Sequence, residues 1–472
     1  MSRLPAGVQR LLAPLARRTG WPWLALTALA LGGLLFWRVP AGGDGVDDTR
    51  SAAAMSSANA APTPASGDAA GPVAAPAARN GASLARPEDL LAVAAGTSST
   101  TDGRLLRIYG LIATSQATQA LAEAATLAAE LPNFGLAQLV YADLLTTLTS
   151  PPDDFGAVNA PLRAEASERL RELVAEARAR VGSAGQRPPA GRVPAQFVQV
   201  DPSVRHAVAV DVSRSRLYVF ENTPKGLVLK RDYYSSVGKL GMAKQVEGDL
   251  RTPLGVYFVT GRVAESRLRA PALKDLYGAA ALVLNYPNQY DQLKGRTGSG
   301  IWLHGVASSL FSRAPLATDG CVALSNPDLL DLAHYIERQE TPILIADQIE
   351  WVEPAAALER RASFMRTFDA WRSARRGNDG TAQARFYAAD SRGLVLNMPE
   401  ATRGERKRAA PVPAAAGAEI DAVSVLAWKD DRDVVVVTFT ESAPSSGRPR
   451  LKRQYWLENA GTWQVIYEGS LG

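Results

Sequence analysis

The chain has 472 residues, a length that suits two or three domains joined by linkers. The net charge is +5 at pH 7, and the densest basic run, 403–408, is short and has no aromatic neighbours, so we expect no nucleic-acid partner. One cysteine and three histidines, without ligand spacing among them, exclude an intramolecular disulfide and a zinc site of the usual kind.

Residues 1–38 predict a cytoplasmic tail followed by a membrane anchor or a signal. Four arginines precede the uncharged apolar run 21–37, and three aspartates follow it within 44–48. This order of charges predicts that the N-terminus stays in the cytoplasm and that the remainder of the chain is exported. A cleaved signal peptide is the alternative, because residues 39–41 (VPA) have the small-residue form of a cleavage site.

Two segments of different amino-acid composition follow the apolar run. Residues 39–100 are rich in Ala, Gly, Pro and Ser and predict a disordered tether, because they cannot bury enough apolar surface to offset the entropy of ordering. Residues 101–182 carry apolar residues at helical spacing and predict a helical domain. Its short hairpins resemble a tetratricopeptide-type pair. We expect the helices to pack together, and a homodimer through them is a further expectation.

After a linker at 183–196, the pattern changes to β-strands over 198–350. Residues 206–222 alternate between apolar and polar and predict a hairpin with its turn at 213–215. More strands follow, and the stretch that begins with Asn326 predicts a helix with Asn326 as its N-cap. We therefore expect a mostly β domain with a helix near its end.

Residues 355–472 predict a third domain, in which a long amphipathic helix precedes three strand candidates. A long helix followed by a curved antiparallel sheet resembles the NTF2-like fold, an α+β cone with a pocket. No acid–base pair stands out there. The predicted fold class is a multidomain α+β chain with an N-terminal anchor, a helical segment, a mostly β domain and this C-terminal cone.

The only cysteine, Cys321, follows His304 by seventeen positions, and each lies beside a glycine. A cysteine attacks a carbonyl carbon as the thiolate, so it needs a base or a cation nearby. His304 ends an apolar strand, and the carbonyl of Gly305 can hold its second ring nitrogen. Backbone N–H groups near Gly320 and Cys321 are candidates for an oxyanion hole. From these residues alone, a buried structural Cys and a structural His remain open.

The motif from His304 to Asn326 resembles the active-site motif of the L,D-transpeptidase catalytic (YkuD-type) domain. The resemblance extends through 251–257, 277–305 and the helix after Cys321. It implies a mostly β catalytic domain in which Cys321 is the nucleophile and His304 the base. The other implied site residues are Gly305, whose carbonyl orients His304, and the substrate or oxyanion residues Gly320, Ser325, Asn326 and Asp319.

Two positions depart from the usual motif. Asp319 stands where a histidine is usual, and Ala323 stands where an arginine that binds a substrate carboxylate is often found. With the C-terminal domain, these changes look more like the Csd6/YafK-like branch of L,D-carboxypeptidases and murein hydrolases. The carboxylate of Asp319 is expected to raise the pKa of Cys321.

The resemblance implies acyl transfer on peptidoglycan stem peptides at the carbonyl of the L-centre of meso-diaminopimelate, with water or an amine as acceptor. It requires no metal or organic cofactor. An outer-membrane lipoprotein or a D-amino acid is a further expected donor or acceptor, and the expected location is the periplasm, at the inner membrane. The alternatives are a non-catalytic peptidoglycan-binding scaffold and a sortase-like thiol transpeptidase, whose motif is not present here. His206 and His334 are expected to be structural.

Overall fold

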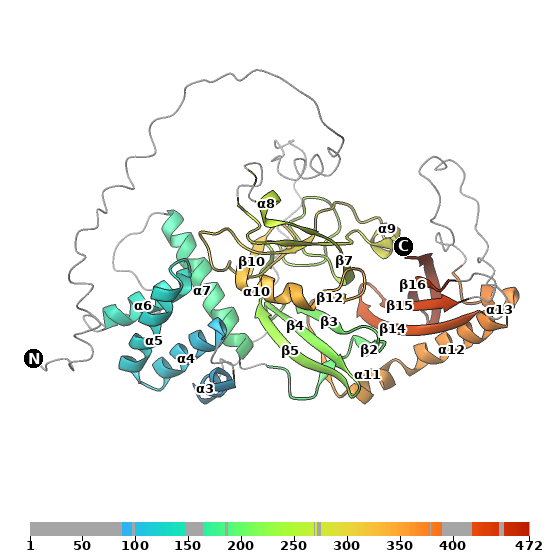
Figure 1. Ribbon diagram of the computed structural model, residues 1–472, viewed down its shortest axis with the longest axis horizontal. Helices are drawn as coiled ribbons and strands as arrows, with labels where there is room; N and C mark the ends of the chain where they lie inside the picture. Colours follow the sequence, from blue (N-terminus) through green and yellow to red (C-terminus); the bar gives the residue numbers. More distant parts are fainter. Residues whose placement is uncertain are drawn as a thin grey trace, which may run out of the picture. The chain divides into compact units, whose positions relative to one another are not determined.

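The computed structural model describes residues 87–96, 100–147, 164–184, 187–268, 270, 275–377, 379–388, 418–442 and 448–471 (Figure 1). The predicted anchor or signal, most of the predicted tether and the basic run 403–408 lie outside these residues. Within the described ranges, no helix has the length and apolar character that crossing a membrane requires.

The predicted helical domain is helical and extends further toward the N-terminus than predicted. Its helices are α3 (Pro87–Gly96), α4 (Thr101–Ala113), α5 (Ala117–Glu130), α6 (Gly135–Thr147) and α7 (Ala164–Ala184). The prediction of a disordered tether is wrong for α3. Acidic residues in the first turn of this helix favour it, and Leu90 and Ala94 are buried against Leu106 and Ala184. The tetratricopeptide-type assignment stays a prediction.

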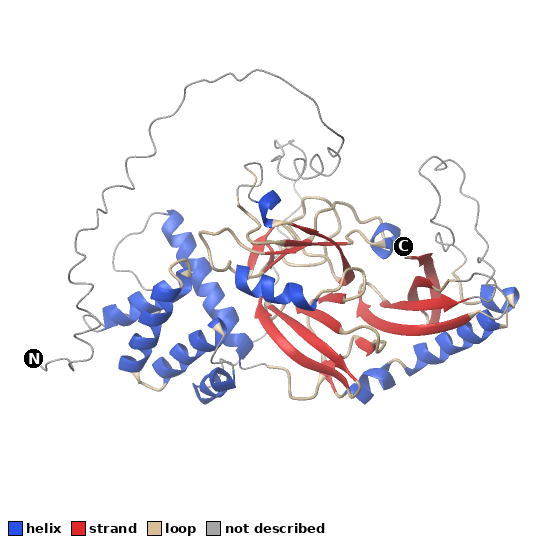
Figure 2. Cartoon of the chain, viewed as in Figure 1, coloured by secondary structure: helices blue, strands red, loops and turns tan. Residues whose placement is uncertain are grey.

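The second domain is built on an eight-stranded sheet, drawn in red in Figure 2, with the order β11-β9-β8-β7-β12-β3-β4-β5. Its strands are β3 (His206–Asp211), β4 (Arg216–Thr223), β5 (Gly226–Tyr234), β7 (Gly255–Val263), β8 (Ala281–Leu284), β9 (Trp302–His304), β11 (Val322–Ala323) and β12 (Pro342–Ala346). The predicted hairpin is β3–β4. Neighbouring strands are antiparallel except for β12–β3 and β11–β9, which are parallel.

Shorter elements surround this sheet. The strand β6 (Val237–Gly238) pairs in parallel with β10 (Leu316–Thr318), and β1 (Val193–Pro194) pairs with β13 (Trp351–Val352). The short helices are α8 (Glu265–Leu268), α9 (Gln289–Leu293), α10 (Asn326–Leu332) and the 3-10 helix η3 (Ala333–Tyr335).

The N-cap of α10 is Ser325, so the prediction of Asn326 is wrong by one residue. The Ser325 hydroxyl accepts a hydrogen bond from the backbone N–H of Asp328 at 3.2 Å. Asn326 is the first helical residue instead, because its side-chain amide is hydrogen-bonded to backbone outside the helix.

The C-terminal domain contains a second sheet and three helices. The helices are α11 (Pro354–Arg360), α12 (Ala362–Arg376) and α13 (Gly380–Ala384), and the strands are β14 (Glu419–Lys429), β15 (Asp433–Ser442), β16 (Arg450–Asn459) and β17 (Thr462–Ser470). Four strands replace the predicted three, because a turn at Ala460 and Gly461, both with positive φ, divides the last segment into a hairpin. The fifth strand, β2 (Phe197–Gln199), comes from the edge of the predicted β domain and pairs with β14.

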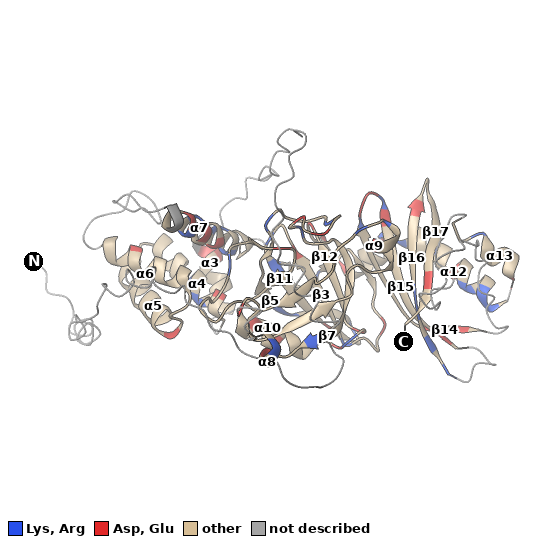
Figure 3. Ribbon diagram, turned by 90° about the horizontal axis from the view of Figure 1, so that it is seen from above, with Lys and Arg blue, Asp and Glu red and all other residues tan. Residues whose placement is uncertain are grey.

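Both faces of this second sheet are buried. Val434 and Val436 of β15 belong to a core shared with the eight-stranded sheet. Val435 and Val437 belong to the opposite core, which contains Trp371 of α12. Burial on both faces explains the unbroken apolar run of β15. The last turn of α12 carries the basic residues Arg375 and Arg376; Figure 3 draws all Lys and Arg in blue. The NTF2-like assignment stays a prediction.

A buried ion cluster joins the helical domain to the eight-stranded sheet. Arg180 of α7 and Arg216 of β4 each donate to a different carboxylate oxygen of Asp102 in α4. Arg180 also pairs with Glu176 at 2.9 Å, and Arg216 pairs with Asp232. Burial by itself raises the pKa of Asp102, but the two arginine charges outweigh it and lower that pKa to about 2.

Replacing Arg180 by Met should destabilise the protein strongly, because Glu176 and one oxygen of Asp102 lose their buried partner. We expect the free energy of unfolding to fall by about 3–5 kcal/mol, measured by urea titration of the full chain. The matched control is Arg104→Met, which breaks a surface pair with Glu130 and should cost at most about 1 kcal/mol. Equal losses in the two variants would contradict the structural role of Arg180.

Candidate functional site

The parallel pair β9–β11 brings the two predicted catalytic side chains to one edge of the eight-stranded sheet. In its register Val322 lies opposite Leu303 and Ala323 lies opposite His304. Residues two apart in a strand share a face, so Cys321, just before β11, lies on the same face as Ala323 and His304. Extended by one residue, the ladder places Cys321 next to Trp302 and diagonally across from His304, at the same edge of the sheet.

His304 is a buried, neutral imidazole at neutral pH. Its Nδ1 lies 2.5 Å from the carbonyl oxygen of Gly305, a hydrogen bond that assigns the ring proton to Nδ1 and leaves Nε2 as the acceptor. The ring of Tyr277 stands edge-on at 5.0 Å between centroids. Burial and the charge of Arg313 lower the pKa of His304 to about 4, against the opposing effect of the Gly305 carbonyl. His304 is thus prepared to accept a proton.

Cys321 is a protonated thiol in this structure. Its Sγ donates to the carbonyl oxygen of Gly300 at 3.3 Å, a bond that only the thiol can make. Burial, with the negative charge of Asp319 in the same direction, raises the pKa of Cys321 to about 11, although the backbone N–H of Trp302 favours the thiolate. The site therefore holds a neutral thiol beside a neutral imidazole, and not a thiolate–imidazolium pair.

Gly320 makes possible the turn before the nucleophile. Its φ is +128°, and a Cβ there would lie 2.7 Å from the carbonyl oxygen of Arg251, so only glycine fits. Its N–H donates to the hydroxyl of Thr318 at 3.2 Å, and that hydroxyl donates to the carbonyl of Cys321 at 2.7 Å. The N–H of Gly320 is thus engaged within the turn, and the expectation that Gly320 helps to shape an oxyanion site stays a prediction.

Asn326 joins backbone segments on either side of the catalytic histidine. Its Oδ1 accepts from the N–H groups of Ala279 at 3.0 Å and Val306 at 3.2 Å, and its Nδ2 donates to the Val306 carbonyl at 2.9 Å. A Cβ on Gly305 would lie 2.0 Å from Oδ1, so this close approach requires glycine. Asn326 therefore positions the backbone beside His304, where the sequence had suggested a substrate contact.

Ser325 and Asp319 have partners within the chain, and their implied contacts with a substrate stay predictions. The side chain of Ser325 is buried and caps α10. Asp319 is exposed and forms an ion pair with Lys239 at 2.9 Å, so it acts on Cys321 through its charge and not through a hydrogen bond. Cys321 and His304 lie at the same edge of the sheet, while Gly320, Ser325 and Asn326 hold the backbone around them.

A family model then identifies the domain that carries this pair. The model of the L,D-transpeptidase catalytic domain, YkuD, matches residues 205–345. Residues 205–345 are an L,D-transpeptidase catalytic domain. The match includes the eight strands of the sheet, His304 and Cys321.

Several solved structures resemble parts of the chain. Bd1075 from Bdellovibrio bacteriovorus is 26% identical, covers 59% of this chain and 98% of its own, and has a TM-score of 0.47. Pgp2 from Campylobacter jejuni, a helical cell shape determining protein, is 19% identical over 60% of this chain and 96% of its own, with a TM-score of 0.43. An L,D-transpeptidase from Mycobacterium smegmatis is 16% identical over 30% and 58%, with a TM-score of 0.20. No curated protein matched the chain.

Three residues near the pair escaped the sequence analysis of the transpeptidase domain: Tyr277, Arg313 and Thr318. Tyr277 shields the imidazole, and Thr318 braces the turn. Arg313 acts electrostatically on both His304 and Cys321. One signal was available, because Arg313 is the only basic residue between His304 and Cys321.

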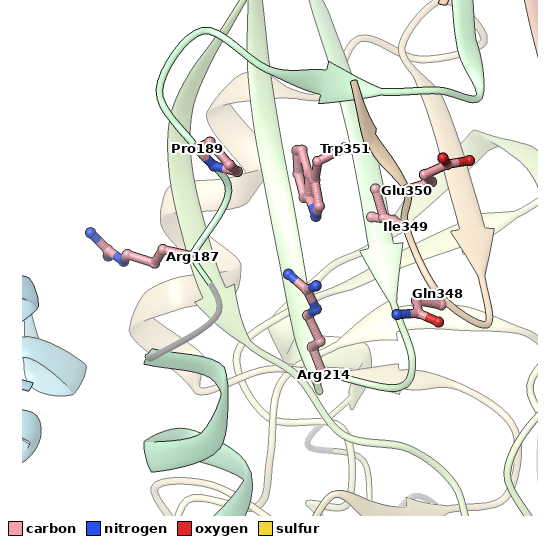
Figure 4. A pocket seen from close by; sticks show the side chains of 7 residues that line it. All are labelled: Arg187, Pro189, Arg214, Gln348, Ile349, Glu350 and Trp351. Atoms are coloured by element: carbon pink, nitrogen blue, oxygen red, sulfur yellow. The ribbon is translucent and has the colours of Figure 1, made fainter. Parts of the chain in front are cut away.

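An open cleft of about 640 Å³ lies at the β3–β4 turn and the segment before β13, away from the catalytic pair (Figure 4). The Arg214 side chain extends toward the indole of Trp351, whereas Arg187 points outward. The lining contains no Cys or His, so we assign no chemistry to it. The described residues likewise contain no group of three His, Cys, Asp or Glu that could hold a metal ion.

Replacing Asp319 by Asn should lower the pKa of Cys321, because the thiolate then meets one negative charge fewer. Below the pKa the thiolate fraction sets the alkylation rate, so iodoacetamide should modify Cys321 about two- to tenfold faster at pH 8. The control is Asp369→Asn, which removes an equal charge from α12. An unchanged or slower reaction in Asp319→Asn would show that the carboxylate does not act on the sulfur.

Proposed function

We propose that the chain catalyses cysteine-dependent acyl transfer on peptidoglycan stem peptides, at the carbonyl of the L-centre of meso-diaminopimelate. The main support is the β9–β11 register, which brings Cys321 and His304 to the same edge of the sheet within residues that match the L,D-transpeptidase catalytic domain. The hydrogen bond from Nδ1 to Gly305 supports the same role, because it leaves Nε2 as the proton acceptor.

In the proposed reaction, proton transfer accompanies attack, because thiol and imidazole are both neutral beforehand. Nε2 of His304 takes the thiol proton while Sγ of Cys321 bonds to the carbonyl carbon. The tetrahedral intermediate then breaks its C–N bond, and the leaving amine receives the proton from His304. A thioester on Cys321 remains.

The second half of the reaction releases the acyl group. An acceptor attacks the thioester carbon, His304 takes the acceptor's proton, and the C–S bond breaks to regenerate the thiol of Cys321. Water gives a trimmed stem peptide, and an amine gives a cross-link. We propose water as the main acceptor, because Asp319 and Ala323 depart from the usual motif in the way that resembles the branch of L,D-carboxypeptidases and murein hydrolases. The N–H of Cys321 is our candidate oxyanion donor, since that of Gly320 is engaged.

The remaining predicted features complete the proposal. We propose a periplasmic protein held at the inner membrane by residues 21–37, with 39–86 as a tether that reaches the peptidoglycan. A lipoprotein or a D-amino acid is the proposed alternative to water. The C-terminal domain is proposed to be NTF2-like, and the helical segment is proposed as the site of any homodimer.

A non-catalytic peptidoglycan-binding scaffold is the second candidate. The bond from the thiol of Cys321 to Gly300 favours it, because this bond holds the sulfur in its unreactive form. Turnover by the wild-type chain separates the two candidates.

Replacing Cys321 by Ala should abolish conversion of purified muropeptides, followed by mass spectrometry, and leave the fold intact. His304→Gln should slow the reaction by roughly 10²–10⁴-fold, the usual contribution of a positioned base. His334→Gln, which changes an exposed histidine after α10, is the matched control and should leave the rate unchanged. Conversion above a few per cent in Cys321→Ala would rule out Cys321 as the nucleophile.

The pH dependence of kcat/KM should show a broad plateau from about pH 5 to about pH 10. The rate should fall as the pH drops through the His304 pKa of about 4, because protonated imidazole cannot take the thiol proton. It should also fall as the pH rises through the Cys321 pKa of about 11, because the pair then lacks the proton for the leaving amine. A narrow bell centred between pH 6 and 8 would indicate a thiolate–imidazolium pair instead.

A further inference from the structure

The loop 305–315 leads from His304 toward the nucleophile and carries a single charged side chain, that of Arg313. It is held from two sides. The N–H of Phe311 donates to the carbonyl of Asn133 in the helical domain at 3.0 Å, and the ring of Phe311 lies 4.5 Å from that of Phe134. On the other side, the hydroxyl of Tyr234 donates to the carbonyl of Arg313 itself at 2.9 Å. The backbone of Arg313 is therefore fixed.

The side chain of Arg313 lies beside the catalytic pair. Its Nη2 donates to the carbonyl of Leu276 at 2.8 Å, next to Tyr277, whose ring is 5.0 Å from that of His304. The positive charge of Arg313 acts on both reacting groups, since it contributes to lowering the pKa of His304 and favours the thiolate of Cys321.

Arg313 has no carboxylate partner among the described residues, a property that it shares with Arg251 and Arg453, but it is the arginine whose charge acts on both His304 and Cys321. Arg180, Arg216 and Arg296 each form ion pairs with Asp or Glu. Arg313 makes one side-chain hydrogen bond, to a backbone carbonyl, and Asp319 nearby is paired with Lys239. Burial lowers the pKa of Arg313, whereas the negative charges that Cys321 and Asp319 can carry oppose this shift. The remaining donors of the guanidinium are thus available to a ligand.

A planar guanidinium binds a carboxylate through two parallel hydrogen bonds. The stem peptide of the proposed reaction has two carboxylates close to the bond that breaks, one on the leaving residue and one on the D-centre of diaminopimelate. We infer that Arg313 binds one of these carboxylates and determines a preference for anionic over neutral substrates. This inference rests on the proposed function for the identity of the ligand, but the anion site at Arg313 can be tested without turnover.

The first experiment compares two alkylating reagents on Cys321 of the full chain, anionic iodoacetate and neutral iodoacetamide. Any change in the pKa of the thiol affects both rates equally, so their ratio reports attraction of an anion to the sulfur. Arg313→Gln should lower the iodoacetate-to-iodoacetamide ratio by about three- to tenfold, and Arg313→Lys should retain most of it. Arg231→Gln, which removes an equal charge from an exposed site on β5, should leave the ratio unchanged. An unchanged ratio in Arg313→Gln overturns the inference.

The second experiment measures KM and kcat for three tetrapeptide stems: the free acid, the C-terminal amide and the form amidated at the D-centre. Arg313→Gln should raise KM for the free acid by roughly 10–100-fold, the contribution expected of a charged hydrogen bond. Each amide lacks one of the two carboxylates. Arg313→Gln should have little effect on KM for the amide in which the carboxylate that Arg313 binds is missing, and this result identifies the bound carboxylate. An equal loss on all three substrates overturns the inference. If the wild-type chain turns over none of them, the proposed function fails while the alkylation ratio still decides whether Arg313 forms an anion site.

Discussion

The site depends on two residue pairs, Val322–Leu303 and Ala323–His304, which form the whole ladder between β11 and β9. Parallel strands cannot be joined by a tight turn, so the chain must make a long crossover between them. Here the crossover, 305–321, contains no helix that could pack it onto the sheet. Its position comes from outside contacts, with Asn133 and Phe134 of the helical domain on one side and Tyr234 on the other. The helices therefore take part in building the site although they supply no reacting group.

The two sheets support the site from the opposite direction. Their shared core contains Phe258 and Leu344 from the eight-stranded sheet and Leu426 and Val436 from the C-terminal sheet. The salt bridge from Arg296 to Asp430 joins the same two domains at the edge of this core, and Arg296 also pairs with Asp291 of its own domain. A change in the C-terminal sheet thus reaches β7 and β12, in the middle of the eight-stranded sheet, through apolar packing.

Local patterns in the sequence were sufficient for most elements and for the central pair. The β3–β4 hairpin and α12 follow from apolar periodicity, and His304 with Cys321 follows from a motif whose spacing the domain requires. Non-local contacts decide the rest. The helix α3 is buried by Leu106 and Ala184, which lie in other helices. The strand β2 pairs with β14, which lies more than 200 residues away in the sequence, so no local pattern could have predicted this pairing.

The roles of the residues around the pair were also beyond a local pattern. Asn326 looked like a helix cap or a substrate contact, but its amide fits between the Ala279 and Val306 backbones, which only the folded chain brings together. Asp319 occupies a motif position, yet its partner Lys239 is eighty residues away. Sequence motifs identify which groups react, whereas tertiary contacts determine which groups hold them.

The protonated state of Cys321 has a consequence for its chemical durability. The thiolate, and not the thiol, attacks peroxide and disulfides. A thiol with a pKa of about 11 is therefore oxidised slowly at neutral pH. The sequence contains no second cysteine that could trap a sulfenic acid as an internal disulfide and so return it to the reduced form. In the proposed mechanism His304 takes the thiol proton only during attack, so Cys321 would be protected from oxidation between turnovers, whereas a permanent thiolate would not.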